Sequence, residues 1–435
     1  MRVIPVLLAA LLTCAAVGVG ALPAADRSAS ADVGPTGPGA PPASAAAADA
    51  TQVNATPVRV LSLNDSAAVA ADVDAVTIDA GTAVGFGADA SAARIETVAV
   101  RERVENASTS EERQIRILDG LNEVDKQAIT LRSRQETAIA AYAAGEITAE
   151  ELLVELARIR ASAAELESRV ELLADLAAET EGFTLDDGRV FPLLYDLRTF
   201  DGPVRERTVR ALDGDRTATT RVYVAATESG VVLSTVADDR YVRETFRADR
   251  HDRGGGGIDE GTAQNVTRRS YPEIYDAAGG TVSGQGSGGT FLFDLTYPNG
   301  TLTAFVGGGT ERVFMEHQRV DLAGVSPGPA VSRTLDLTLR VNRTFPGGPL
   351  RVAVVDPATG EPVDAVVKLG REGGESVEAG TTGGDGVLWT VSPRGEFVVT
   401  VVEVGSTDVS TVGVTPTEPV TVEEAYAGNG SDDGE

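Results

Sequence analysis

Two runs of apolar residues, with alternating spacings of four and three, constrain this 435-residue chain more than any other feature. Such spacing places the side chains on one helical face, because an α-helix has 3.6 residues per turn. The first run, on a helix predicted from Glu111 to Ala144, comprises Ile117, Leu121, Val124, Ala128, Leu131, Gln135, Ala138 and Tyr142. The second, which follows Gly145 and the cap residue Thr148, comprises Leu152, Leu156, Ile159, Ala163, Leu166, Val170, Leu173 and Ala177. The two seams predict an antiparallel, coiled-coil-like helical hairpin within residues 89–181.

Three leucines lie outside these seams and add apolar surface: Leu153, Leu172 and Leu176. That surface requires a third partner, either another domain of the chain or another protein chain. We therefore expect the hairpin either to pack on a neighbouring β-domain or to mediate self-association or binding of a protein partner. Gly120 lies inside the first helix, where glycine costs about 1 kcal/mol, and predicts fraying or a kink there.

Residues 188–322 have the alternating apolar pattern of a β-rich domain. The predicted strands are Arg207–Leu212, Thr217–Ala226, Val231–Val236, Tyr241–Arg247, Thr290–Tyr297, Thr301–Val306 and Thr310–Asp321. Two glycine-rich stretches, 249–262 and 277–290, are interpreted as surface loops because they lack the G-K-[ST] ending of a phosphate loop. Residues 58–88 have an uncertain fold, with strand-like pieces at Val58–Leu63 and Val76–Asp79.

After a linker at 323–333, residues 334–424 show short strands at regular spacing, the pattern of a small β-sandwich. The segment contains Asp356, Thr359-Gly360-Glu361-Pro362, Ala365, Thr382, Asp385-Gly386, Pro393 and Gly395. Through these residues it resembles transthyretin-like, carboxypeptidase-regulatory-type modules. The resemblance implies an Ig/transthyretin-like accessory module that spaces or binds and does no chemistry. Trp389, the sole tryptophan, is expected in its core, and 425–435 form an acidic disordered tail. The predicted fold class is thus α+β multidomain.

The N-terminus indicates export. Arg2 precedes an uncharged run to Ala25, followed by an alanine-, proline- and glycine-rich stretch at 26–57. We interpret 1–25 as a signal peptide and 26–57 as a disordered spacer. No second apolar run has spanning length, which predicts a mature chain without a membrane span. Cys14, the only cysteine, is a possible lipidation site, although Leu12 and Thr13 fit a lipobox poorly.

The charge pattern is strongly acidic, with a formal net charge of −28. Only Lys126 and Lys368 are lysines, and the other bases are arginines. This composition resembles proteins of salt-loving archaea, in which salt screens the repulsion between carboxylates. The same charge argues against nucleic acid and against anionic membranes as partners.

Asparagine usage is the most specific signal. Seven of the eight asparagines begin an Asn-X-Ser/Thr sequon, and only Asn122 does not. We interpret the seven as exposed glycosylation acceptors of an exported protein: Asn54, Asn64, Asn106, Asn265, Asn299, Asn342 and Asn429. Asn299-Gly300 is also a hairpin signal, because both central residues of a type I′ turn need φ > 0.

Several chemistries have no support in the sequence. His251 and His317 have no second histidine or cysteine at ligand spacing, so no metal site, cofactor or catalytic residue is assigned. Glu316 and His317 are neighbours on a strand and should point to opposite faces. The acidic pairs 186–187, 238–239 and 213/215 are interpreted as solvated surface, with glycosidase carboxylates or calcium ligands as the alternative.

The whole order of elements resembles a class of secreted haloarchaeal proteins that has no assigned activity, through residues 121–159 and 297–320. We expect a secreted or cell-surface halophilic glycoprotein that acts as a non-catalytic binding or scaffolding protein and contacts the cell envelope. One alternative is an extracellular carboxylate-dependent hydrolase whose sandwich is accessory. Another is a lipid-anchored sensor or transport accessory protein.

Overall fold

The structure is a computed structural model that describes residues 59–63, 69–73, 80–215, 221–251, 257–279, 282–287, 289–325, 328–371 and 373–422. Several predictions fall outside these residues: the signal peptide, Cys14, the spacer, the strand at Val76–Asp79, Asn54, Asn64, Asn429 and the acidic tail.

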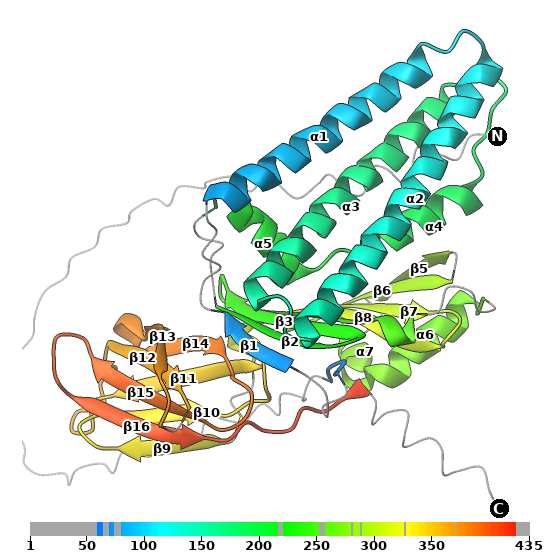
Figure 1. Cartoon of the computed structure of the whole chain (residues 1–435). Coiled ribbons are helices and arrows are strands. Elements are labelled where there is room, and N and C mark those ends of the chain that lie inside the picture. The colour runs from blue at the N-terminus through cyan, green and yellow to red at the C-terminus, as the bar shows by residue number, and fades with distance from the viewer. Residues whose placement is uncertain are drawn as a thin grey trace, which may run out of the picture. The chain divides into compact units, whose positions relative to one another are not determined.

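The predicted α+β multidomain class is confirmed. Long helices come first, a β-rich part follows, and a C-terminal sandwich of antiparallel strands ends the described chain (Figure 1). The helices are α1 (Ala80–Glu105), α2 (Ser110–Ala143), α3 (Ala149–Ala178), α4 (Asp187–Arg198), α5 (Pro203–Leu212), α6 (Glu260–Ser270) and α7 (Pro272–Ala278). Within the described residues, none of these helices is long and apolar enough to span a membrane.

The helical hairpin forms as predicted from α2 and α3. Every predicted seam residue of both helices is buried. Thr148 and Glu151 form a reciprocal capping box at the start of α3, which satisfies backbone N–H groups that have no partner within the helix.

A third long helix, α1, was not anticipated; it packs against both α2 and α3. Arg169 of α3 is buried between them and donates hydrogen bonds to Glu96 and Thr97 of α1 and to Gln127 of α2. Helix α1 escaped prediction because it is rich in small residues, so periodic large apolar side chains do not mark it.

The predicted fraying at Gly120 was also wrong, since α2 is continuous from Ser110 to Ala143. A Cβ atom on Gly120 would lie 2.9 Å from Cδ1 of Leu173. Glycine at this position therefore permits the close approach of α2 to α3, which offsets its low helix propensity.

The middle of the chain forms one eight-stranded antiparallel sheet in the order β1-β2-β3-β4-β8-β7-β6-β5. Its strands are β1 (Val69–Val73), β2 (Val222–Thr227), β3 (Gly230–Ala237), β4 (Arg240–Arg247), β5 (Val282–Ser287), β6 (Thr290–Tyr297), β7 (Gly300–Gly307) and β8 (Arg312–Asp321). Six of the seven predicted strands correspond to β2, β3, β4, β6, β7 and β8, and the first four residues of the one predicted at Thr217–Ala226 lie outside the described residues.

Two predictions within this region were wrong. Residues Arg207–Leu212 belong to helix α5, which Pro203 starts. Their alternating apolar residues resemble the pattern of a strand. The glycine-rich stretch 277–290 contains the edge strand β5, in which Gly284 and Gly286 lie against the rings of Phe293 and Phe291. Glycine allows these aromatic side chains to cover the strand, so it does not mark a loop here.

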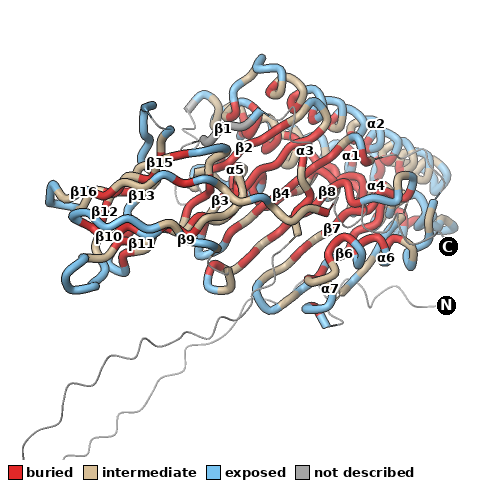
Figure 2. The backbone as a smooth tube through the Cα atoms, turned by 90° about the horizontal axis from the view of Figure 1, so that it is seen from below, coloured by how far each residue is buried: buried red, intermediate tan, exposed pale blue. Residues whose placement is uncertain are grey.

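The two faces of the sheet have different covers. One face packs against α2, α3 and α5 through Leu153, Leu156 and Val204. The other face is covered partly by α6 and α7. Leu172 and Leu176 pack with α4 and the other long helices. The third partner of the hairpin is therefore supplied by this chain itself. Figure 2 shows buried residues along the central strands and exposed residues on the outer sides of α1 and α2.

An extended segment, residues 59–63, crosses the second face and is held through its backbone. Glu316 accepts from the Leu61 N–H at 2.9 Å, and Arg243 donates to the Leu61 carbonyl at 2.8 Å. Val60 also pairs in parallel with Thr421. We call residues 59–63 the strap. The strap brings the two ends of the described chain side by side.

The C-terminal part confirms the predicted sandwich. One sheet contains β9 (Ala330–Thr334), β10 (Thr338–Asn342), β11 (Pro349–Val355) and β14 (Val387–Val391). The other contains β12 (Ala365–Gly370), β13 (Ser376–Thr381), β15 (Phe397–Glu403) and β16 (Val409–Val414). Trp389 is not in the core between the sheets, as expected, but packs against Tyr223, Tyr241 and their neighbours on the eight-stranded sheet. Strand alternation explains this, because Leu388 is the residue of β14 that faces the sandwich core.

The turn at residues 297–300 is present but displaced by one residue. Tyr297 pairs with Gly300, so the central turn residues are Pro298 and Asn299. Gly300 is required instead by packing, because its Cβ would lie 2.0 Å from the Arg319 carbonyl oxygen. The two-residue turn with positive φ at both positions is formed by Asp238 and Asp239, at 51° and 59°.

Candidate functional site

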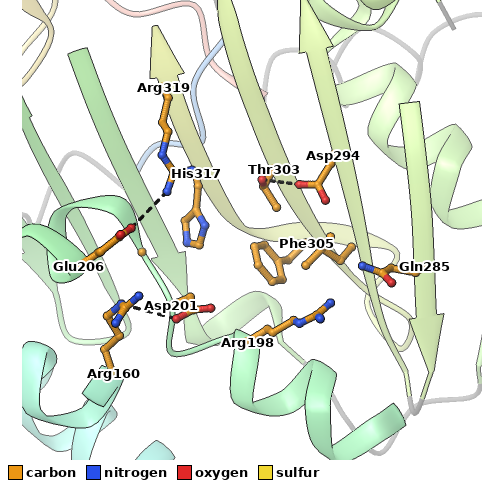
Figure 3. Close-up of a pocket in the computed structure, with 12 residues that line it drawn as sticks. Arg160, Arg198, Asp201, Glu206, Gln285, Asp294, Thr303, Phe305, His317 and Arg319 are labelled. Atoms are coloured by element: carbon orange, nitrogen blue, oxygen red, sulfur yellow. Dashed lines mark hydrogen bonds and ion pairs between the residues drawn. The ribbon is translucent and has the colours of Figure 1, made fainter. Parts of the chain in front are cut away.

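A polar pocket of about 260 Å³ lies between the helical layer and the sheet. Helices supply Arg160, Arg198 and Glu206, and the loop between α4 and α5 supplies Asp201 and Gly202. The strands supply Gln285, Leu292, Asp294, Thr303, Phe305, His317 and Arg319. Figure 3 shows the rings of His317 and Phe305 near the centre, with the charged side chains around them.

The loop that forms one wall is fixed by a buried carboxylate of the sheet. Glu244 accepts from the N–H of Val204 at 2.9 Å and from Nε of Arg205 at 2.8 Å. It thereby satisfies the start of α5, where backbone N–H groups lack helical partners. Gly202 is necessary here, since a Cβ would lie 2.0 Å from the Glu244 carboxylate. Both charged side chains are almost fully buried, so the wall of the pocket is held rigidly.

His317 projects from β8 into the pocket and is only 6% exposed. Burial, followed by the positive charge of Arg319, lowers its pKa to about 3, and a hydrogen bond that the ring donates to the Asp201 backbone opposes the shift. The ring is therefore neutral at ordinary pH. Its Nε2 atom is buried, and no hydrogen-bond partner for it exists among the described residues. Such an atom is costly to bury unless something in the pocket donates to it.

The pocket carries three arginines and three carboxylates, so its formal charges cancel. Arg160 lies 3.6 Å from Asp201, and Arg319 lies 3.6 Å from Glu206. The Arg198 guanidinium lies 5.8 Å above the Tyr195 ring. Counting described side chains only, no carboxylate lies within 4.0 Å of Arg198.

Asp294 is the matching acidic group on the sheet side. It accepts from the Thr303 hydroxyl at 2.6 Å, and no described cation lies within 4.0 Å of it. Strand alternation places its side chain on the helix-facing side of β6, together with Leu292. Thus one cation and one anion of the lining, Arg198 and Asp294, form no ion pair within 4.0 Å among the described side chains, although the charge of Arg198 acts on Glu167 and Asp201 from farther away.

Two nearby carboxyl groups have raised pKa values. Burial, followed by repulsion from Asp201, raises the pKa of Glu167 on α3 to about 7. Burial also raises the pKa of Asp201, opposed by the charges of Arg160 and Arg205. Shifts of this kind are concentrated at functional sites, although ion-pair networks also produce them.

The other strongly buried pair, Arg243 and Glu316, does not contribute to this pocket. Glu316 also accepts from the Tyr271 hydroxyl at 2.6 Å, and burial raises its pKa. Its side chain faces the strap, whereas His317 faces the helices. The prediction that these neighbours point to opposite faces is therefore confirmed.

A second depression of about 830 Å³ runs along the turn between α2 and α3. Its lining includes Thr148 and Glu151, whose polar atoms cap α3, and Arg134, which pairs with Glu155 at 2.7 Å. These groups already have partners, so this depression is the weaker candidate for a ligand site.

The sequon asparagines are not gathered at the pocket. Asn106, Asn265 and Asn299 are exposed, in the turn before α2, on α6 and in the β6–β7 turn. Asn342, at the end of β10, is only 3% exposed and donates its amide to the Gly328 carbonyl at 3.1 Å. The prediction that Asn342 lies on the surface was wrong, because a three-residue sequon does not reveal whether its asparagine is buried.

The predicted acidic pairs are structural or exposed in this fold. Asp186 caps α4 by accepting from the Gly188 N–H. Asp238 accepts from Arg207 at 2.8 Å, and Asp215 lies 3.8 Å from Arg210. His251 stacks on Phe314 at 4.0 Å and does not reach His317. In the described parts of the chain, no three histidine, cysteine or acidic residues form a metal-binding group.

Sequence reasoning singled out only His317 among the residues of the pocket. The others come from four helices or loops and four strands, and their side chains meet only in the folded chain. The one available signal was the spacing of His317 and Arg319, which are two residues apart in a predicted strand. Because side chains alternate along a strand, this spacing places both polar groups on the same face.

Three family models match the chain. A domain of unknown function (DUF7096) matches residues 1–217, and a family of unknown function (DUF7094) matches residues 222–326. An archaeal fibronectin-III type-like domain matches residues 329–411. No curated protein and no solved structure matches the chain. The chain is thus similar to archaeal proteins and carries a C-terminal Ig-like domain, of fibronectin-III rather than transthyretin type.

Proposed function

We propose that this protein is a non-catalytic binding protein of an archaeal cell surface, and that the polar pocket is its ligand site. The observation that carries the proposal is that one pocket contains both the Arg198 guanidinium and the Nε2 atom of His317, which has no hydrogen-bond partner among the described residues. Small-molecule sites use a few convergent polar groups of this kind to orient a ligand. The fibronectin-III type-like domain is a module typical of surface and binding proteins.

Binding is favoured over catalysis by the electrostatics of the pocket. With a pKa of about 3, His317 would make a poor general base near neutral pH, because efficient proton transfer needs a pKa near the operating pH. Asp201 and Glu206 each lie 3.6 Å from an arginine, so both carboxylates already take part in ion pairs of the protein. These groups are suited to hold a ligand in one orientation.

Export, glycosylation and halophilic character belong to the same proposal. The N-terminal apolar run, the seven sequons and the net charge of −28 support them. The exposure of Asn106, Asn265 and Asn299 is compatible with attached glycans. We propose attachment to the cell envelope through the N-terminal region, either by the spacer or by a lipid on Cys14.

The binding proposal is tested with the full chain, purified after export in a salt-loving host and kept in molar salt. Thermal-shift measurements against a panel of amino acids, sugar acids, sugars and inorganic anions should give at least one stabilising ligand. Its effect should be lost in Arg198→Ala and retained in Arg134→Ala, a matched arginine at the second depression. If stabilisation survives Arg198→Ala, the ligand site lies elsewhere.

The halophilic proposal has its own measurement. Circular dichroism should show loss of cooperative unfolding after dialysis from molar to low salt, because repulsion among the carboxylates is then unscreened. Identical melting curves in both conditions would refute it. The intact mass of the exported chain reports whether a lipid on Cys14 begins the mature protein.

A carboxylate-dependent hydrolase is the second candidate, favoured by the raised pKa values of Glu167 and Asp201. This function predicts turnover of a ligand identified above and its loss in Asp201→Asn. A ligand that binds to both the wild type and Asp201→Asn without being consumed by either would favour a binding protein over a hydrolase.

A further inference from the structure

The chemistry of the pocket ligand follows from which groups lack partners, and this inference rests on the proposed binding function. The hydrogen bond between His317 and the Asp201 backbone favours the protonated ring. The ring must therefore donate in that bond, and its acceptor is the backbone carbonyl. A neutral imidazole has one N–H group, so the buried Nε2 atom is an acceptor and needs a donor from the ligand.

Arg198 defines the opposite requirement. Arg160 and Arg319 have carboxylates at 3.6 Å, whereas Arg198 lines the pocket with no described carboxylate within 4.0 Å. Figure 3 shows its side chain extending below Phe305 toward the side of the pocket where Gln285 lies. A guanidinium has five donors in a planar fork that matches a carboxylate. The ligand therefore needs a carboxylate or a similar planar anion.

The charge balance selects between ligands that meet both requirements. The lining charges cancel, and Asp294 is the anion that lacks a cation in the described chain. A dianion such as phosphate would bring two negative charges to a lining with three carboxylates, in which Arg198 is the arginine that has no carboxylate within 4.0 Å among the described side chains. A ligand with one negative and one positive group would supply an opposite charge to both Arg198 and Asp294 and leave the pocket neutral.

We infer that the pocket binds a zwitterionic amino acid, with its carboxylate on Arg198 and its ammonium on Asp294 and the Nε2 atom of His317. Apart from Gly202, only Leu292 and Phe305 are apolar among the lining residues. The pocket therefore suits a polar side chain, for which Gln285 and Thr303 are available. About 260 Å³ is sufficient for a single amino acid and too small for a long peptide.

The test uses isothermal titration calorimetry of the exported full chain in molar salt. L-glutamine is the first probe and L-leucine, of similar size, is its apolar counterpart; the remaining proteinogenic amino acids complete the set. N-acetyl-L-glutamine lacks the ammonium, L-glutamine amide lacks the carboxylate, and D-glucuronate is a carboxylate whose only donors are hydroxyls. We expect polar amino acids to bind, and each of these three analogues to bind at least about tenfold more weakly.

Two variants locate the groups of the ligand. Asp294→Asn should weaken binding of the amino acid about tenfold or more but leave the weak binding of the N-acetyl compound unchanged. Arg198→Ala should also weaken binding of the amino acid about tenfold or more, and should leave the weak binding of L-glutamine amide unchanged. Asp294 is exposed, so its variant preserves the fold, and Arg134→Ala is the control that should bind normally.

The outcomes separate this inference from the proposed function. Equal binding of glucuronate or of N-acetyl-L-glutamine overturns the zwitterion while leaving a ligand site at Arg198. Binding of L-glutamine that is unaffected by both Arg198→Ala and Asp294→Asn overturns the assigned contacts. Failure of every compound in the full panel to bind overturns the inference and the proposed function together.

Discussion

The buried pair of Arg205 and Glu244 gives the sharpest prediction about what holds the pocket together. Replacement Glu244→Leu removes the acceptor of the Val204 and Arg205 N–H groups and of the Arg205 Nε atom. It also leaves the Arg205 side chain, only 1% exposed, without its ion-pair partner. Breaking a buried ion pair in this way should lower the free energy of unfolding by about 3–5 kcal/mol.

The double variant Arg205→Met/Glu244→Leu separates a lost charge pair from lost packing. Without either charge, the cost should be smaller than that of Glu244→Leu alone by about 1–2 kcal/mol or more, because no unpaired charge stays buried. Urea unfolding in molar salt measures both variants. Circular dichroism follows the helices, and the fluorescence of Trp389, the only tryptophan, follows the junction between the sheet and the sandwich. A double variant at least as unstable as Glu244→Leu alone would refute this reasoning.

Three further predictions concern other parts of the molecule. Leu61→Ala should cost about 2–5 kcal/mol in urea unfolding, because the strap buries this side chain completely; a loss below about 1 kcal/mol would show that the strap is not part of the core. The folded pKa of Glu167, about 7, exceeds its unfolded value, so its contribution to stability is lost as pH rises from about 4.5 to 7; Glu167→Gln should be more stable than wild type at pH 8 and about equal at pH 4.5, as thermal melts would show. Peptide mass spectrometry of the exported chain should find glycans on Asn299 and none on the buried Asn342, and full occupancy of Asn342 would contradict its burial.

The helical hairpin could be predicted to within a residue or two because its information is local. The four-three spacing and the Thr148 capping box each determine structure over a few turns. The same reasoning failed for α1, whose burial depends on contacts with α2 and α3 rather than on its own periodic pattern. Strand prediction was reliable where apolar residues alternate over a whole strand, as in β4 and β8.

Errors arose where tertiary contacts overrode local preferences. Gly300, Gly284 and Gly202 each permit a close approach of another segment, which local turn rules cannot anticipate. The strap is held by Arg243, Glu316 and the backbone near Val420, all distant in sequence. Trp389 was assigned to the wrong core because the face of β14 that it occupies meets a second domain.

The pocket itself could not be assembled from sequence. His317 was noticed as one of two histidines, but its neutral state depends on burial beneath the helices and on the charge of Arg319. Arg198 is one of many arginines in the chain, and only the fold shows that it lacks an ion-pair partner among described side chains. The chemical meaning of both residues is thus a property of the tertiary structure.

The most direct test of the ligand site is the nitrogen chemical shift of His317 in chain labelled with ¹⁵N-histidine. The chain has only two histidines, and a His251→Gln variant assigns the remaining signals. As L-glutamine is added in molar salt, the Nε2 resonance of His317 should shift with saturation while that of Nδ1 changes little, because the ligand donates to Nε2 alone. A saturable heat of binding that leaves Nε2 unchanged would contradict a ligand in this pocket.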